Sequence, residues 1–330
     1  MRVAVCGLGS YVARVGVIPA LRNSTWTQFL GGYTSSDAIA AEVLTDTEFR
    51  YPDYEALLSD PAVDAVYLPL PNDLHLDFIE QAVRAGKHVL CEKPLLLDED
   101  AYDRLDRLLE GSSQLVTEAF MSSYHPRLRQ VIARATEFGD IVSVATSFTG
   151  TLNPLAGYRL DATRGGGSLY DVGIYALFPI VSLLGAEPLA IHTETTTTDA
   201  PHPVDLTLHC MLRYAGGAVG TFVTSFISGE SQNLRILTTA ASLEVNKACT
   251  PGPNDIDWTL TNSNGTPEHQ ASPGIDPYLA MVDEVFTAFS AGHEPSWTLA
   301  RSRELARLLY RIEHSWRQSA TATNVLADGQ

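Results

Sequence analysis

The first 120 residues alternate short apolar runs with stretches of helical periodicity. Most of the runs are apolar at almost every position, which is typical of strands buried on both faces of a parallel sheet. This alternation favours a doubly wound sheet with right-handed crossovers. The expected strands are Val3–Cys6, Phe29–Tyr33, Ala65–Leu68, His88–Cys91 and Leu115–Thr117, and the expected helices are Tyr11–Leu21, Tyr54–Leu58, Leu74–Ala85 and Glu99–Leu109.

After about residue 140 the pattern changes to strands with polar–apolar alternation, joined by turn sequences. This pattern predicts a large, mostly antiparallel open sheet in an α+β domain. The expected class is therefore α/β with a parallel N-terminal domain at 1–122 and an α+β domain at 123–330. The later strands are expected at Ile141–Phe148, Ala190–Thr197, Leu206–Tyr214, Ala218–Phe226, Arg235–Thr239 and Ser242–Val245, and the helices at Ser168–Leu184, Pro277–Ala291 and Thr298–Gln318.

The chain is acidic, with 39 acidic and 22 basic residues and a net charge of -17. This balance argues against a nucleic-acid or membrane-surface partner. No apolar run comes near the ~18 residues of a membrane span, and the N-terminus lacks signal-peptide features. The four cysteines show no metal-ligand pairing, and Cys6 and Cys91 fit reduced core residues. We expect a cytoplasmic protein without a metal site.

Two glycines, Gly7 and Gly9, directly follow the first expected strand. Gly7 suits a tight turn, and Gly9 lets the main chain approach a pyrophosphate at the start of the next helix, which begins at Ser10 and Tyr11. Val12 stands where the third glycine of the usual fingerprint would be. The position of the glycines between a strand and a helix predicts a dinucleotide site.

The second strand ends in hydroxyl residues, Ser35 and Ser36, with Asp37 one step later. An acidic residue at this tip would bind the ribose 2′-hydroxyl of NAD, whereas an arginine would favour NADP. The same residues fit an ordinary polar turn without a role in cofactor selection equally well. The choice between NAD and NADP stays open.

The strand at 65–68 runs into a loop that contains Pro69, Leu70 and Asn72, followed by His75. This is the carboxyl edge of the parallel sheet, where such folds bind their ligands. We count these four residues as candidate cofactor contacts, with a purely structural role for His75 as the alternative.

Glu92 and Lys93 directly follow the expected strand His88–Cys91, and Pro94 follows them. Lys93 is thus a cation at the carboxyl edge, where a nicotinamide would lie, and its ammonium group can donate to a reacting oxygen. Both Glu92 and Lys93 are candidate cofactor-binding residues, and Lys93 is also a catalytic candidate.

A second candidate cluster follows the glycine run at 165–167. Ser168 can cap the next helix through its hydroxyl. Asp171 and Tyr175 are four residues apart and therefore share a helical face. A carboxylate can orient a phenol, and a nearby cation such as Lys93 favours the ionised phenol. The alternative is that Asp171 only stabilises the helix start and Tyr175 is a core residue.

The Glu92-Lys93-Pro94 motif and the glycine-rich stretch through Asp171 and Tyr175 resemble the Gfo/Idh/MocA oxidoreductases, relatives of glucose–fructose oxidoreductase and inositol dehydrogenase. The likeness covers nearly the whole chain. It implies a Rossmann NAD(P)-binding domain at 1–122 and a substrate-binding domain at 123–330, whose sheet forms a homodimer or homotetramer. Further matching segments are Asp64–Tyr67, Ala85–Val89 and Tyr124–Pro126.

The resemblance also implies that Lys93, Asp171 and residue 175 surround the reacting carbon. Many inositol dehydrogenase relatives have histidine at the last position, whereas Tyr175 is similar to the dihydrodiol/D-xylose dehydrogenase and deoxysugar 3-ketoreductase branches. The segment from Tyr158 to Asp161 is similar to those branches too. Val12 and Ser36 depart from the pattern, and Ser36 stands where NADP-using relatives often have arginine.

We therefore expect an NAD(P)-dependent dehydrogenase or reductase that moves a hydride between nicotinamide and a secondary alcohol or ketone of a sugar, sugar derivative or cyclic polyol. Tyr175 would exchange the proton, assisted by Lys93 and oriented by Asp171. The alternatives are an NAD-assisted glycosidase or eliminating enzyme and a non-catalytic NAD(P)-binding regulator. Candidate substrate contacts are Tyr124, His125, Asn153, Tyr158 and Arg159.

Overall fold

The computed structural model describes residues 1–254, 256–272, 274–318 and 323–324. By packing, the chain forms two compact units: Met1–Tyr124 with Asp276–Arg303, and His125–Ile275 with Glu304–Gln330. The boundary expected after residue 122 lies near the first break between the units. The return of 276–303 to the first unit was not expected from the sequence, because a contiguous division was assumed.

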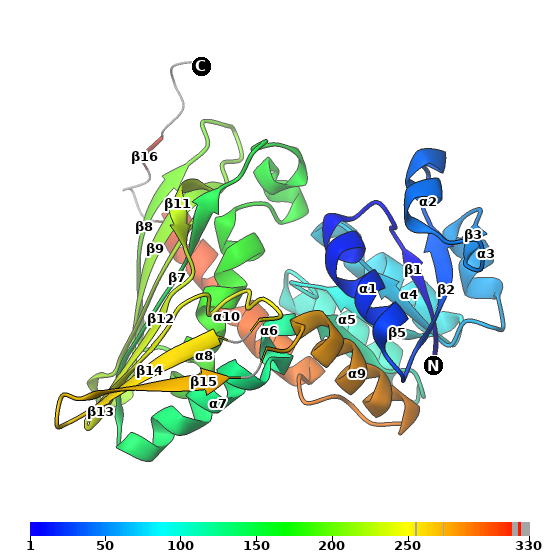
Figure 1. The fold of residues 1–330 in the computed structure, drawn as a ribbon. Helices are drawn as coiled ribbons and strands as arrows, with labels where there is room; N and C mark the ends of the chain where they lie inside the picture. The colour runs from blue at the N-terminus through cyan, green and yellow to red at the C-terminus, as the bar shows by residue number, and fades with distance from the viewer. Residues whose placement is uncertain (255, 273, 319–322, 325–330) are drawn as a thin grey trace. The chain divides into compact units, whose positions relative to one another are not determined.

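The first unit contains a six-stranded parallel sheet. Its strands are β1 (Arg2–Cys6), β2 (Gln28–Tyr33), β3 (Phe49–Tyr51), β4 (Ala65–Leu68), β5 (His88–Glu92) and β6 (Val116–Ala119). The strand order is β3-β2-β1-β4-β5-β6, and every pair is parallel (Figure 1). This is the doubly wound order, whose direction reverses beside β1, and it confirms the expected N-terminal fold.

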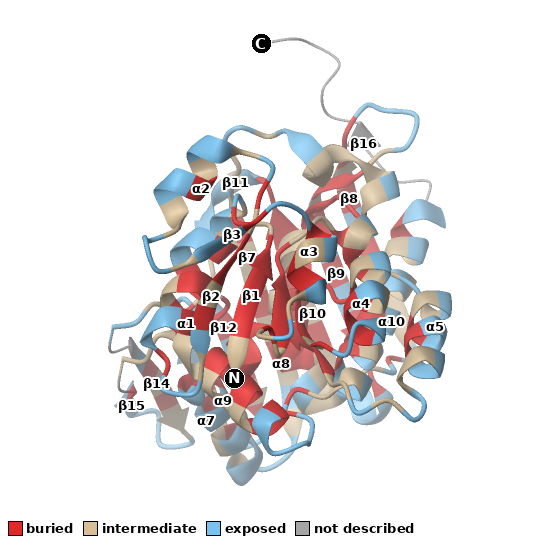
Figure 2. Ribbon diagram, turned by 90° about the vertical axis from the view of Figure 1, so that its right-hand side faces the viewer, coloured by how far each residue is buried: buried red, intermediate tan, exposed pale blue. Residues whose placement is uncertain are grey.

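Helices flank this sheet: Figure 2 shows buried residues along β1, and exposed residues on helices such as α2 (Asp37–Val43) and α5 (Glu99–Leu109). The expected helix at 11–21 is divided into a π-helical turn and an α-helix, and the short helix at 37–43 was not expected. The helical segments are η1 (Ala13–Val17), α1 (Ile18–Asn23), α2 (Asp37–Val43), α3 (Tyr54–Ser59), η2 (Asn72–Leu74), α4 (His75–Arg84), α5 (Glu99–Leu109), α6 (Met121–Tyr124) and α9 (Pro277–Ser290).

The second unit contains a ten-stranded sheet. Its strands are β7 (Ile141–Thr151), β8 (Ala190–Thr197), β9 (Asp205–Arg213), β10 (Val219–Ser225), β11 (Ile227–Ser231), β12 (Leu234–Thr238), β13 (Ala241–Val245), β14 (Ile256–Asn262), β15 (Pro267–Ser272) and β16 (Thr323–Asn324). The order is β15-β14-β13-β12-β7-β10-β9-β8-β16, with β11 paired to β7. Only β7 with β10 and β8 with β16 are parallel among these pairs, so the expected mostly antiparallel sheet is confirmed.

The helix α8 (Ile174–Leu184) carries Tyr175 and packs on β7 and β10. The helix approaches the sheet closely, because a Cβ at Gly220 would lie 2.5 Å from Ile180. Thr146 on β7 also donates its hydroxyl to the Ala176 carbonyl at 2.7 Å. The other segments of this unit are α7 (Pro126–Ala135), η3 (Thr136–Phe138), η4 (Gly157–Leu160), η5 (Ala162–Arg164), η6 (Leu169–Gly173), α8 (Ile174–Leu184), η7 (Ala215–Gly217) and α10 (Leu299–Gln318), whose first residues belong to the first unit.

One expectation about membranes needs correction. The stretch Ala162–Leu184 is long and apolar enough to cross a membrane by length and composition, although no such segment was expected. Within the protein, 61% of its apolar window is buried. Its apolar residues therefore pack in the core of the second unit.

Candidate active site

The turn after β1 is built around two glycines. Gly7 has a φ of +123°, in the region that favours glycine, and its N–H donates to the Tyr33 carbonyl at 3.0 Å. A Cβ at Gly7 would lie 3.3 Å from Pro69, and one at Gly9 would lie 3.1 Å from Ile39. The glycines thus bring the main chain close to the neighbouring loop and helix, as a pyrophosphate-binding turn requires.

The next helix begins at Tyr11, directly after this turn. Ser10 donates its N–H to the Gly7 carbonyl at 3.0 Å. The first N–H groups of a helix, here those of Tyr11 and Val12, have no acceptor within the helix and can bind an anion. Further along, the Tyr278 ring packs against Gly16 in η1, where a Cβ on residue 16 would lie only 2.7 Å from the ring. This turn fits the pyrophosphate of a dinucleotide.

The end of β2 carries the two serines expected near the ribose. Ser35 is exposed, and Ser36 accepts a hydrogen bond from the Ile39 N–H at 3.3 Å and so caps α2. Asp37 forms an ion pair with Arg50, 2.6 Å apart. Arg50 is a basic side chain at this edge that the sequence reading missed, because it belongs to the unexpected strand β3.

The loop after β4 includes Pro69 and Asn72, both buried, and Leu70, which is half-buried. His75 is fully buried, with its Nε2 2.9 Å from the Leu70 carbonyl oxygen and its Nδ1 3.0 Å from that of Pro94. Burial lowers the pKa of its imidazole. His75 therefore links the loops that follow β4 and β5, and its contact with the cofactor stays a prediction.

Lys93 follows β5 directly, at the expected carboxyl edge, and a cis peptide bond joins it to Pro94. Its main-chain N–H donates to Oε2 of Glu92 at 3.2 Å. Glu92 is buried and accepts a hydrogen bond from the Tyr67 hydroxyl at 2.6 Å. Burial raises the pKa of the Glu92 carboxyl.

A second buried carboxylate, Glu118 on β6, holds the segment after Lys93. Its Oε1 accepts from the Leu95 N–H at 2.7 Å. Its Oε2 accepts from Nε1 of Trp297 at 2.8 Å and from the Ser302 hydroxyl at 2.9 Å. Burial raises the pKa of Glu118. The sequence reading missed this residue because its partners come from distant segments.

In the second unit, Asp171 lies in the π-helical turn η6 and pairs with Arg159. The Arg159 Nε donates to Oδ2 of Asp171 at 2.6 Å, and the guanidinium lies over the Tyr158 ring, 5.0 Å from its centroid. Both members of the ion pair are partly accessible, with 34% of the Arg159 side chain and 18% of the Asp171 side chain exposed. The ion pair therefore holds Asp171 where its carboxylate remains partly accessible to solvent.

Tyr175 lies in the first turn of α8, four residues after Asp171. It is half-buried, and its ring makes an edge contact with Phe148 on β7, with centroids 5.5 Å apart. A π turn holds slightly more residues than an α turn, so residues four apart still lie close to one face. Lys93 belongs to the first unit, whereas Asp171 and Tyr175 belong to the second.

The helix that carries these residues begins differently from the prediction. The Ser168 hydroxyl does not cap the helix; it donates to Oδ2 of Asp205 at 2.6 Å. The same oxygen accepts the Leu169 N–H at 2.7 Å. Asp205, the first residue of β9, therefore provides the cap that was expected from Ser168, and no local signal pointed to it.

The remaining candidate substrate contacts differ in accessibility. Tyr124 and His125 are each 2% exposed, and His125 accepts a hydrogen bond from the Arg127 N–H through Nδ1 at 3.2 Å. Burial lowers the pKa of His125 to about 4. Asn153 is exposed and precedes a cis peptide bond to Pro154. Their contacts with substrate stay predictions.

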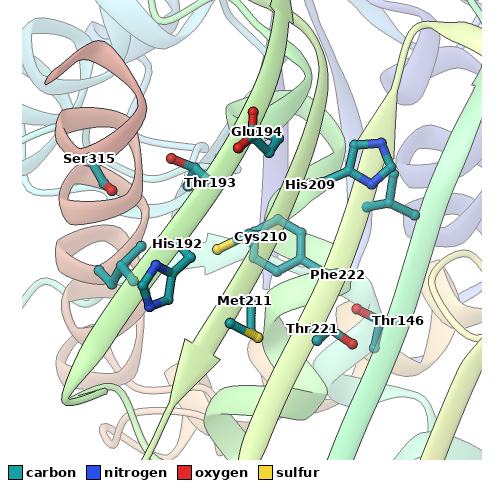
Figure 3. Close-up of a pocket in the computed structure, with 12 residues that line it drawn as sticks. Thr146, His192, Thr193, Glu194, His209, Cys210, Met211, Thr221, Phe222 and Ser315 are labelled. Carbon is teal, nitrogen blue, oxygen red and sulfur yellow. The ribbon is translucent and has the colours of Figure 1, made fainter. Parts of the chain in front are cut away.

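The second unit also has a cavity of about 610 Å³ on its sheet (Figure 3). It lies over β8, β9 and β10, with Ser315 contributed by α10. None of its lining residues is a predicted catalytic residue. Among residues 1–254, 256–272, 274–318 and 323–324, no group of three or more His, Cys, Asp or Glu side chains could hold a metal ion.

Comparison with protein families gives two matches along the chain. The first, described as an oxidoreductase family with an NAD-binding Rossmann fold, covers residues 1–120. The second, the C-terminal domain of the same GFO/IDH/MocA group, covers residues 125–244. Together the two matched segments span most of the chain.

Individual relatives match different shares of the chain. D-xylose 1-dehydrogenase (NADP(+)) 2 from Haloferax volcanii is 33% identical, over 91% of this chain and 92% of its own. A dTDP-3,4-didehydro-2,6-dideoxy-α-D-glucose 3-reductase from Actinomadura kijaniata is 44% identical over 41% of each chain. A crystal structure of a 3-ketoreductase from that organism, in complex with NADP and TDP-benzene, has a TM-score of 0.86 at 26% identity and covers 98% of both chains.

Proposed function

Because the chain belongs to the GFO/IDH/MocA family of oxidoreductases, we propose that it transfers a hydride between NAD(P) and a secondary alcohol or ketone of a sugar, sugar derivative or cyclic polyol. The observation that carries the proposal is the Arg159–Asp171 ion pair, 2.6 Å long and one helical turn from Tyr175. A fixed carboxylate one helical turn from a half-buried tyrosine is suited to support proton exchange at a substrate oxygen.

The cofactor would be held by the turn of the first unit. Gly7 and Gly9 let the main chain approach its pyrophosphate, and the N–H groups at Tyr11 and Val12 can donate to it. Ser35 and Ser36 would lie near the adenosine ribose, where Arg50 could pair with the 2′-phosphate of NADP. The Haloferax and Actinomadura relatives are named or crystallised with NADP, which supports NADP as one of the two cofactors.

When bound, the nicotinamide supplies or accepts the hydride. The protein supplies position and proton transfer. Tyr175 gives a proton to the substrate oxygen during reduction and takes it back during oxidation. Asp171 orients the phenol, and the ammonium group of Lys93 donates to the same oxygen and favours the ionised phenol. Tyr158 and the remaining donors of Arg159, with Tyr124, His125 and Asn153, are our candidates for the sugar contacts.

A screen of sugars, polyols, keto-sugars and nucleotide-linked deoxysugars tests this function. The purified protein is mixed with each compound and NAD(P)+ or NAD(P)H, and absorbance at the nicotinamide band is followed. We expect a net change with at least one compound. Loss of a glycoside without a net absorbance change would favour a redox-assisted glycosidase, and tight NAD(P) binding without turnover of any compound would favour a regulator.

We also propose a homodimer or homotetramer formed through the sheet of the second unit. The exposed side chains on this sheet include Met211, which is 42% exposed, and they surround the cavity over β8, β9 and β10. The four cysteines are free and buried, which suits the reducing cytoplasm where we place the protein. The acidic net charge leads us to expect neither nucleic acid nor membrane as a partner.

A further inference from the structure

Asp205 is a buried carboxylate that the proposed chemistry does not use. Only 2% of the residue is exposed, and it is the first residue of β9. Its Oδ2 accepts two hydrogen bonds, from the Ser168 hydroxyl at 2.6 Å and from the Leu169 N–H at 2.7 Å. Both donors stand at the start of the helix that carries Asp171 and Tyr175.

The local backbone is shaped to admit this carboxylate. Gly167 has a φ of +109°, and a Cβ there would lie 2.2 Å from Oδ1 of Asp205. Ser168 is fully buried, and its hydroxyl lies 2.8 Å from that of Thr224 on β10. The start of the helix is thus hydrogen-bonded to Asp205 on β9 and to Thr224 on β10.

The surroundings of Asp205 set its charge. Tyr170 on η6 donates to Oε2 of Glu313 at 2.7 Å, and Arg317 pairs with Oε1 of the same carboxylate at 2.8 Å. Burial raises the pKa of Asp205 to about 7, with a smaller contribution from the Glu313 charge. The hydrogen bonds from Ser168 and Leu169 act in the opposite direction and lower the pKa. The ionisable neighbours are therefore Tyr170 on η6 and Glu313 and Arg317 on α10, and β10 contributes a hydroxyl.

We propose that Asp205 is a positioning residue, whose carboxylate holds the first turn of the helix and so places Asp171 and Tyr175 for the reaction. The inference rests on the proposed function of those two residues. An ionised carboxylate accepts shorter and stronger hydrogen bonds than the neutral acid. Because the pKa of Asp205 is about 7, these two hydrogen bonds are stronger above neutral pH than below it, although burial of the charge lowers the stability of the whole fold there.

Asp205→Asn keeps the shape of the side chain and an acceptor oxygen but removes the charge. At pH 8 we expect kcat to fall about fivefold in Asp205→Asn and more than about tenfold in Asp205→Ala, with the Kd for NAD(P)H unchanged. In the parent, kcat falls as the pH drops through about 7, and Asp205→Asn lacks that decline. Asp257→Asn, an exposed carboxylate on β14, is the matched control and should behave as the parent.

The amide hydrogen-exchange rate of residues 165–175, measured by mass spectrometry, reports how stable the start of the helix is and does not depend on enzyme activity. We expect faster exchange in Asp205→Asn than in the parent at pH 8, after correction for intrinsic rates. Unchanged exchange, or faster exchange with the parent's kcat and pH profile, overturns the positioning role. If Tyr175→Phe kept the parent's rate, the proposed chemistry would fail instead, and the exchange data would still decide whether Asp205 holds the turn.

Discussion

The Nε of Arg159 donates to Oδ2 of Asp171 across 2.6 Å, so an ion pair joins two predicted site residues of the second unit. Arg159 was expected only as a substrate contact. The ion pair gives it a second task, because it commits one guanidinium donor to the carboxylate and leaves the others for a ligand. The geometry thus joins a predicted substrate residue to a predicted catalytic one.

Arg159→Gln should reduce kcat on the substrate found in the screen by about tenfold or more, because Asp171 loses its charged partner and its fixed orientation. Steady-state kinetics in both directions measures this effect. Arg213→Gln, at an exposed arginine on β9, serves as the control and should change kcat less than about twofold. Equal kinetics of the two variants would show that the ion pair has no part in the reaction.

Gly7→Ala should weaken NAD(P)H binding by about tenfold or more. The new side chain would need a φ of +123° and would crowd Pro69 at 3.3 Å, so the turn would move away from the pyrophosphate. Fluorescence titration with NADH and NADPH gives the Kd. Gly111→Ala has comparable backbone strain, with a φ of +72° and no atom within 4 Å of the new Cβ. A similar Kd change in both variants would count against a cofactor role for the glycine turn.

Glu118→Gln should lower the free energy of unfolding by about 1–3 kcal/mol, because the amide places an N–H group among the N–H and O–H donors that the carboxylate now accepts. The donors are Leu95, Trp297 and Ser302. Urea denaturation measures the loss, and Glu110→Gln on the surface is the control. A stability equal to that of the control would mean that Glu118 does not fix the segment after Lys93.

The stability of the parent should depend on pH through Asp205, whose folded-state pKa is raised from 3.8 to about 7 by burial. Folding then favours the protonated form, so the stability that this group contributes is complete below about pH 4 and is lost as the pH rises to about 7. Asp205→Asn does not titrate. The difference in free energy of unfolding, Asp205→Asn minus parent, should therefore rise between about pH 4 and about pH 7. The rise is at most about 4 kcal/mol, because each of the three pH units contributes ~1.4 kcal/mol. Urea denaturation from pH 4.5 to 8.5 checks this, and a constant difference contradicts it.

The parts of the fold that followed local patterns were predicted well from the sequence. Continuous apolar runs located β1, β2, β4, β5 and β6, because burial on both faces demands such runs. Strand β3 was missed, since it has only three residues and Phe49 and Arg50 are exposed. Strand β15 was missed because its polar sequence, Pro-Glu-His-Gln, carries no apolar alternation.

The candidate site also has some residues with a local sequence signal and others without one. The roles of Gly7, Lys93 and Tyr175 stay predictions. Their positions, directly after β1, directly after β5 and within a helix, could be predicted from the sequence. Asp205 and Glu118 could not, since each acts on a segment that only the tertiary fold brings close; Asp205 and Ser168 are 37 residues apart. The hydroxyl of Ser168 looked like a local cap, yet it serves as a donor to that distant carboxylate.

The central claim is that Tyr175 and Lys93 handle the proton during hydride transfer, and single-turnover kinetics with saturating cofactor and substrate tests it most directly. Tyr175→Phe and Lys93→Ala should each slow the hydride-transfer step by about 100-fold or more while the Kd for NAD(P)H stays the same. Tyr310→Phe, at a tyrosine that is 50% exposed, is the control and should keep the parent's rate. If Tyr175→Phe and Lys93→Ala both transferred hydride at a rate close to the parent's, the account would be wrong.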